Sequence, residues 1–221
     1  DWSSDVCSSD LAAYENSEST LSATYVAAMR AVVRSGEQNI VERVEKIRKR
    51  AAERNIAPDA YMYATLLDAY AVGGPSDASV KIPEILASME ANVSTINSCG
   101  KTVVYNTALK LLKESRDPDA TAKADELFQK MKVQGTVDEV TYGTLIALCA
   151  NNGSESSHRS AMRAENLLKE MKERNLQIST HHINSVMNSL IRVGKIPKAA
   201  GLLDRKSTRL NSRHANISYA V

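Results

Sequence analysis

An apolar stripe with helical spacing recurs along this chain, and no other feature constrains its fold as strongly. In each copy the apolar residues follow the spacing i, i+3, i+4 and i+7, which places them on one face of an α-helix. The clearest copies are Ile82, Ile85, Leu86 and Met89, then Ala124, Leu127, Phe128 and Met131, then Ala164, Leu167, Leu168 and Met171. Weaker copies contain Val44, Ile47 and Ala51, and Ala199, Leu202 and Leu203. Because one helix pair cannot bury such a stripe alone, the repetition predicts a stack of neighbouring pairs.

A second helical pattern precedes each stripe and begins with an aromatic residue or, once, with Ile; we call this the leading residue. The leading residues are Tyr25, Tyr63, Tyr105, Tyr142 and Ile183, and they lie 38, 42, 37 and 41 residues apart. The uneven intervals indicate insertions in the turns, where extra residues are tolerated. No stretch shows the alternation of a strand with hairpin turns. The sequence therefore predicts an all-α fold, a right-handed α-solenoid of about five helix-turn-helix repeats, at residues 22–59, 60–101, 102–138, 139–179 and 180–203, the last truncated.

Charge and rare residue types exclude several classes of protein. The 28 Lys and Arg residues against 26 Asp and Glu residues leave a net charge of +2, so the chain as a whole has no strong attraction to nucleic acid or membrane. No apolar run approaches the roughly 20 residues that cross a bilayer. His158, His181 and His182 have no metal-ligand spacing with Cys99 or Cys149, and no nucleophile motif or phosphate-binding glycine loop is present. We therefore expect no catalytic residues, no metal, no cofactor and no membrane contact.

Both ends of the chain look foreign to the repeats. Residues 1–11 back-translate to a nucleotide string whose reverse complement, translated in frame, gives residues 204–212, and residues 217–221 fit its continuation. Such a pair matches the two orientations of one sequencing adapter. Residues 1–11 and 204–221 are therefore expected to be translated adapter sequence, and residues 12–203 to be a fragment of a longer repeat protein.

Several segments resemble the consensus of the pentatricopeptide repeat family. They are Tyr105-Asn106-Thr107, Tyr142-Gly143-Thr144-Leu145-Ile146, Glu126–Lys132 and Asn166–Lys172. The resemblance covers about residues 22–203 and implies the family's solenoid of paired helices. The tetratricopeptide repeat is the nearest alternative, but its first helix requires a Trp, and residues 12–203 contain none.

The resemblance implies binding of single-stranded RNA along the first helix of each repeat, one base per repeat. The residue after each leading residue would read a base together with the last residue of the repeat. These pairs are Val26 with Asp59, Ala64 with Lys101, Asn106 with Asp138 and Gly143 with Ser179, and Asn184 begins a further pair. The residues two positions before the leading residues would sandwich the bases: Ala23, Tyr61, Val103, Val140 and His181. Contacts to phosphates are expected from Arg34, Lys110, Lys113 and Arg192.

The most specific of these expectations concerns Asn106 and Asp138. The amide of Asn106 offers a donor beside an acceptor, which fits the edge of uracil, and Asn with Asp is the family's uracil-preferring combination. Val26 and Ala64 offer only apolar contact and Gly143 has no side chain, so their repeats are expected to be weakly selective. The residues also allow a role without ligand, in which Asp138 is a helix N-cap and the cations are solvated helix ends.

The predicted function is an RNA-binding module without catalysis of its own, acting in organellar RNA processing, stability or translation. The mitochondrial or plastid location is implied by the resemblance alone. Two alternatives remain open: a protein-interaction solenoid within an organellar assembly, and the RNA-binding arm of a nuclease whose catalytic domain lies outside this sequence.

Overall fold

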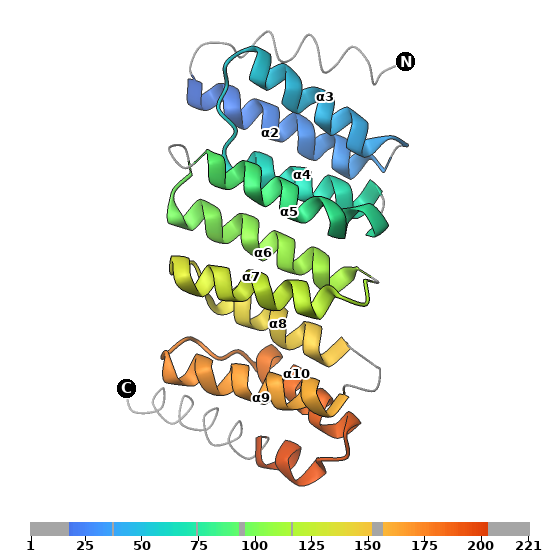
Figure 1. Cartoon of the computed structure of the whole chain (residues 1–221), viewed down its shortest axis with the longest axis vertical. Coiled ribbons are helices and arrows are strands. Elements are labelled where there is room, and N and C mark those ends of the chain that lie inside the picture. The colour runs from blue at the N-terminus through green and yellow to red at the C-terminus, as the bar shows by residue number, and fades with distance from the viewer. Residues whose placement is uncertain are drawn as a thin grey trace, which may run out of the picture. The chain divides into compact units, whose positions relative to one another are not determined.

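The computed structural model describes residues 18–36, 38–73, 75–92, 96–115, 117–151 and 157–202, and the regular structure of these residues is entirely helical (Figure 1). The predicted adapter segments, 1–11 and 204–221, lie outside the described residues, as does Leu203. The helices group into two compact units, which divide between Val137 and Asp138. Among the described helices none is long and apolar enough to span a membrane.

Unit 1 contains three helix pairs. Its helices are α2 (Glu18–Ser35), α3 (Ile40–Glu53), α4 (Ala60–Gly73), α5 (Pro75–Ala91), α6 (Ser98–Glu114) and α7 (Ala120–Gln134). The first helices contact one another in order, α2 with α4 and α4 with α6. Each second helix packs on its own first helix, and α3 and α5 also contact the first helix of the next pair. Successive pairs therefore stack in register, as the repeated stripe predicts.

Unit 2 continues the same alternation. It contains α8 (Glu139–Asn151), α9 (Ser157–Glu173) and α10 (Thr180–Arg192), followed by a further helical stretch at 196–202. Helix α8 pairs with α9, and α10 contacts both. Helix α10 is thus the first helix of the next repeat.

The apolar stripes form the core, as predicted from their spacing. Buried stripe residues are Val44, Ile47, Ala51, Ile82, Ile85, Leu86, Met89, Ala124, Leu127, Phe128, Met131, Ala164, Leu167, Met171 and Ala199. Leu168 is only half-buried. The leading tyrosines are also buried, but Ile183 is half-buried and the preceding His182 takes the interior place. The expected leading residue of the last repeat is therefore the weakest match to its equivalents.

Two of the buried tyrosines, Tyr63 and Tyr105, join first helices to second helices through their hydroxyl groups. The hydroxyl of Tyr105 donates to Oε1 of Glu90 at 2.5 Å and lies 3.0 Å from Oε1 of Gln134. The hydroxyl of Tyr63 donates to the carbonyl of Ser88 at 3.2 Å. Burial, reinforced by the Glu90 carboxylate, raises the pKa of Tyr105 well above its ordinary value, so this hydroxyl remains a donor. These hydrogen bonds explain why Tyr serves at this position better than an aliphatic residue.

The second helices end in similar turns. Asn55, Gly135 and Asn175 follow α3, α7 and α9 with φ of 57°, 68° and 56°, in the left-handed region. In each turn the next amide bonds back to the helix, as Thr136 N does to the carbonyl of Met131 at 3.0 Å. This pattern satisfies the last carbonyls of the helix and reverses the chain.

The connection before α6 differs from the expected repeat boundary between residues 101 and 102. Asn97 caps α6 by accepting the amide of Gly100 at 2.8 Å, so the helix begins at Ser98. Lys101 therefore lies inside α6, not at the end of a repeat. The insertion inferred for the second repeat includes an added turn of helix at this point.

Candidate nucleic-acid interface

The residues two positions before the leading residues are mostly exposed on the first helices of each unit, and we call the three of unit 1, Ala23, Tyr61 and Val103, the column. Tyr61 on α4 is 54% exposed and Val140 on α8 is 59% exposed. Ala23 and His181 are also exposed, whereas Val103 is half-buried. The position expected to sandwich bases is therefore accessible in four of the five repeats. Tyr61 gives the column an aromatic face.

An arginine lies over the exposed ring of Tyr61. The guanidinium carbon of Arg30, on α2, is 5.6 Å from the centroid of the Tyr61 ring. This is within the range of a cation–π contact, and Arg30 is itself exposed. The pair spans two successive first helices and combines positive charge with an aromatic surface, which are the two elements of a single-strand binding site.

The residues after the leading residues differ in accessibility. Val26 and Ala64 are only 5% and 7% exposed, where α2 packs against α4 and α4 against α6. Burial removes the surface that even an apolar contact with a base requires at these two positions. Asn106 on α6 is half-buried and Asn184 on α10 is exposed. The amide-bearing positions are thus the accessible ones.

Gly143 marks a close approach of α8 and α10. A Cβ at this position would lie 2.7 Å from Nε2 of His182. Nδ1 of the same imidazole accepts the amide of Ser179 at 3.2 Å, and Ser179 Oγ accepts the amide of His182 at 3.4 Å, a capping box at the start of α10. Burial, reinforced by His181, lowers the pKa of His182. Glycine here makes room for a neutral, hydrogen-bonded histidine.

Three of the four residues expected to complete the reading pairs are helix N-caps, and Lys101 is the exception. Oδ1 of Asp59 accepts the amide of Met62 at 2.8 Å, and Oδ1 of Asp138 accepts the amide of Thr141 at 2.8 Å. Ser179 caps α10 in the same way. Each of these residues therefore has a structural role independent of RNA. Asp138 belongs to unit 2 and its expected partner Asn106 to unit 1.

The expected phosphate ligands are mostly at helix ends and exposed. Arg34 and Lys110 are exposed. Nζ of Lys113 lies 3.9 Å from Oε1 of Glu114. Arg192, also exposed, donates to the carbonyl of Ala150. Their positions agree with either phosphate contacts or solvated helix ends.

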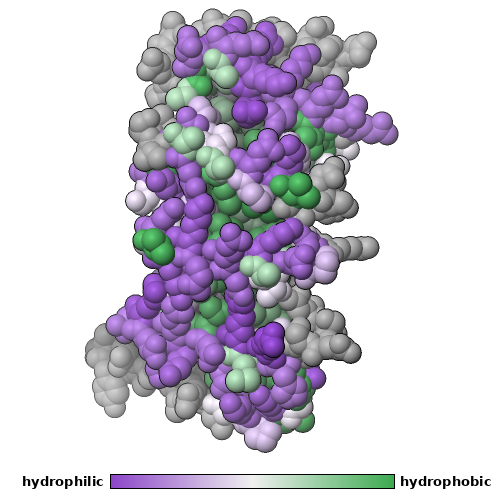
Figure 2. All heavy atoms as spheres, viewed as in Figure 1, coloured by the Kyte–Doolittle hydropathy of each residue, from purple (hydrophilic) through white to green (hydrophobic). Residues whose placement is uncertain are grey.

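The basic run on α3 lies on a second helix. Lys46, Lys49 and Arg50 are exposed, and Arg48 pairs with Glu45 at 2.8 Å. Figure 2 shows a hydrophilic surface over this helix. The run therefore forms a solvated face of α3.

Sequence reasoning did not single out Arg30 or Asp68. Both lie five residues after a leading residue, Arg30 after Tyr25 and Asp68 after Tyr63, and Lys110 is the equivalent on α6. The common distance of five residues from the leading residue can be read from the sequence. The structure adds that the first helices carrying these residues pack side by side.

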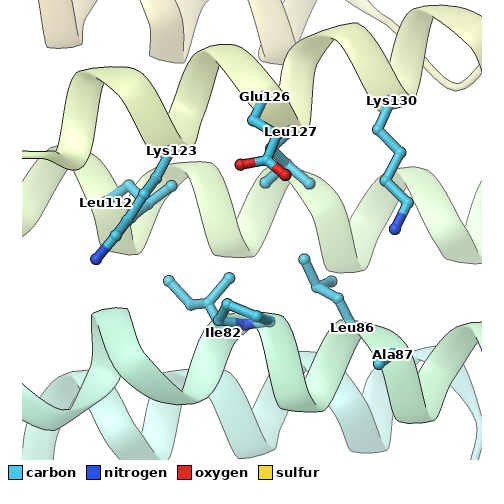
Figure 3. A pocket seen from close by; sticks show the side chains of 9 residues that line it. Ile82, Leu86, Ala87, Leu112, Lys123, Glu126, Leu127 and Lys130 are labelled. Carbon is cyan, nitrogen blue, oxygen red and sulfur yellow. The ribbon is translucent and has the colours of Figure 1, made fainter.

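A recess of about 160 Å³ opens between the second helices α5 and α7 (Figure 3). Ile82 and Leu86 on α5 and Leu127 on α7 give it apolar walls. Lys123 and Lys130 lie at its edge. Nζ of Lys123 pairs with Oδ2 of Asp117 at 2.6 Å, and Nζ of Lys130 pairs with Oε1 of Glu90 at 2.7 Å. The recess is lined mainly by second helices and not by the column that contains Tyr61.

Cysteine and histidine form no metal centre in the part of the chain that the structure describes. Cys149 is buried in α8, and burial raises the pKa of its thiol to about 12, so it is an inert core thiol. His158 is exposed on α9.

Comparison of the sequence and of the structure with known proteins identifies the fold. No protein-family model matches the sequence, and no curated protein matches it. Two crystal structures are similar, one of the pentatricopeptide repeat protein PPR10 in complex with an 18-nt psaJ RNA element and one of its triple cysteine-to-serine variant with the same element. Each has a TM-score of 0.60 at 17% identity, over 83% of this chain and 25% of the PPR10 chain, so this chain spans about a quarter of their length. The chain therefore has the fold of a pentatricopeptide repeat α-solenoid.

Proposed function

We propose that this chain binds single-stranded RNA along its first helices, one base per repeat. The observation that carries the proposal is the exposure of the positions two before the leading residues in each unit, above all that of the aromatic Tyr61 on α4. The similarity in fold to a protein solved with RNA bound supports it. A role in organellar RNA processing, stability or translation, in mitochondrion or plastid, extends the proposal from the family resemblance.

Tyr61 provides a base-stacking contact in this proposal. Base–aromatic stacking contributes about 1–3 kcal/mol per base and tolerates any base. Arg30, over the same ring, adds a positive charge beside the stacked nucleotide. In unit 2, His181 offers an exposed ring at the equivalent position. Stacking accounts for affinity but not for sequence preference.

Asn106 provides the sequence preference. Asn106 is half-buried, and its amide offers the donor and acceptor that match those of uracil. Asp138, an N-cap of α8, is the partner that the family resemblance implies for Asn106. The proposal therefore predicts a preference for uracil that depends on Asn106.

Fluorescence anisotropy with the full chain and short labelled RNAs tests both parts. At low salt, Tyr61→Ala should weaken binding of oligouridylate about tenfold, the factor that corresponds to 1.4 kcal/mol of lost stacking. Tyr61→Phe retains the ring and should bind as the wild type does. Val133→Ala, which truncates a side chain 90% exposed on α7, should have no effect.

The preference for oligouridylate over oligoadenylate should fall in Asn106→Ala. A wild-type chain that binds neither RNA at low salt contradicts the proposed function. Equal binding by Tyr61→Ala and the wild type contradicts the assigned surface.

The apolar recess between α5 and α7 favours a second candidate, a protein-interaction solenoid. A small apolar recess bordered by paired charges suits an aliphatic side chain of a protein better than a nucleotide. Ala87 lines the recess and is exposed, so Ala87→Glu would block it without disturbing the core. This candidate predicts a partner that stays bound after ribonuclease treatment and is lost in Ala87→Glu, while RNA binding is unchanged.

A further inference from the structure

Three charged residues occupy one position on successive first helices of unit 1. Arg30 on α2, Asp68 on α4 and Lys110 on α6 each lie five residues after the leading tyrosine. Because α4 contacts both α2 and α6, the acid lies on the helix between two helices that carry cations. We call these three residues the charged row.

The charged row lies on the same side of the helices as Tyr61. Tyr61 and Asp68 are seven residues apart on α4, which is two helical turns and places them on one face. Arg30 confirms the placement, since its guanidinium lies over the Tyr61 ring. An RNA strand that stacks on Tyr61 therefore runs beside the charged row.

Asp68 is in an unfavourable environment for a carboxylate. It is half-buried, and it forms no hydrogen bond and no ion pair with any residue that the structure describes. Burial raises its pKa, while Lys110 and Arg30 lower it and Glu114 raises it further. The two cations thus act on Asp68 through space without pairing with it.

We propose that Arg30 and Lys110 bind the phosphodiester backbone of RNA, and that Asp68 between them limits the affinity by repelling that backbone. The inference rests on the proposed function, because the RNA strand is what brings phosphates to this row. Arg30 and Lys110 are exposed and neither forms an ion pair within the described residues, so both can accept a phosphate. Asp68 partly cancels their field in the absence of a ligand and opposes the phosphate in its presence.

The test is a substitution that should improve binding. Asp68→Asn removes the negative charge and keeps the shape of the side chain. We expect it to tighten oligouridylate binding about fivefold at low salt, the factor given by about 1 kcal/mol of relieved repulsion. The gain should shrink at high salt, where the screening length falls to a few ångströms.

Glu126→Gln is the matched control. Glu126 is exposed on the second helix α7, so its substitution changes the net charge by the same amount away from the charged row. It should leave binding unchanged. A gain in Asp68→Asn no larger than that in Glu126→Gln would overturn the inference, as would weaker binding by Asp68→Asn.

Inorganic polyphosphate separates the inference from the proposed function, because it has phosphates but no bases. Asp68→Asn should also bind polyphosphate more tightly, and Lys110→Ala should abolish the gain for both ligands. If polyphosphate shows these effects and RNA does not bind, the charged row is an anion site and the RNA proposal fails. If RNA binding depends on Tyr61 but Asp68→Asn changes neither ligand, the function stands and the inference fails. If no variant binds either ligand, both fail.

Discussion

Gly143→Ala should destabilise the protein, although Gly to Ala inside a helix normally stabilises it. The usual gain is about 1 kcal/mol, because Ala has the higher helix propensity. Here the added Cβ would lie 2.7 Å from Nε2 and 3.1 Å from Cδ2 of His182. The imidazole cannot simply rotate away, since Nδ1 holds the amide of Ser179.

The net effect follows from these opposing contributions. Overpacking costs about 1–3 kcal/mol, and losing the capping box costs about 1 kcal/mol more. After subtraction of the propensity gain, Gly143→Ala should lower the free energy of unfolding by about 1–3 kcal/mol. Gly201→Ala is the matched control, because a Cβ there meets nothing within 4 Å. It should leave stability unchanged or raise it slightly.

Urea unfolding followed by circular dichroism measures these differences. A double variant of Gly143→Ala with His182→Ala should recover the helix-propensity gain relative to His182→Ala alone, since the clashing ring is gone. If Gly143→Ala is as stable as Gly201→Ala, the close approach of α8 and α10 is not as described.

Three further predictions concern caps, tyrosines and pH. Asp59→Ala removes the acceptor for the amide of Met62 and should cost about 1–2 kcal/mol of unfolding free energy; no loss in chemical unfolding would contradict the cap. Tyr105→Phe removes the donor to Glu90 and should cost about 1–2 kcal/mol, measured in the same way, because the carboxylate loses one of its two partners in a partly buried site; an unchanged midpoint would argue against this link. Burial lowers the pKa of His182 in the folded protein below 6.5, so the unfolded chain binds the proton more readily. The free energy of unfolding should therefore be highest above pH 6.5 and should decrease as the pH falls through the pKa of the folded protein. His182→Gln keeps a capping side chain that does not titrate and should flatten this dependence in thermal unfolding; an identical pH profile in both proteins would exclude His182 as the cause.

The helical repeat was predictable because burial and periodicity coincide in this chain. Residues of the stripes, such as Met89 and Met131, are buried where their spacing indicates, and so are leading residues such as Tyr105. Periodicity reports which face of a helix is apolar, and a stack of helices buries that face regardless of the details of its turns.

Other features depend on tertiary contacts that spacing does not encode. The burial of Ala64 is set by the packing of α4 against its neighbours, and the need for glycine at 143 is set by His182 on another helix. The position of Lys101 inside α6 follows from the cap at Asn97, which begins the helix about a turn early. The function of the reading positions, including Asn106, stays a prediction.

Photocrosslinking of iodouracil-substituted single-stranded RNA to the full chain, with the adducts mapped by mass spectrometry, shows which residues lie against the bases. Aromatic side chains that stack on a base should form the adducts. We predict modification of Tyr61, with loss of that adduct in excess unlabelled oligouridylate. Adducts confined to the second helices α5 and α7, or none in a complex that forms, would contradict it.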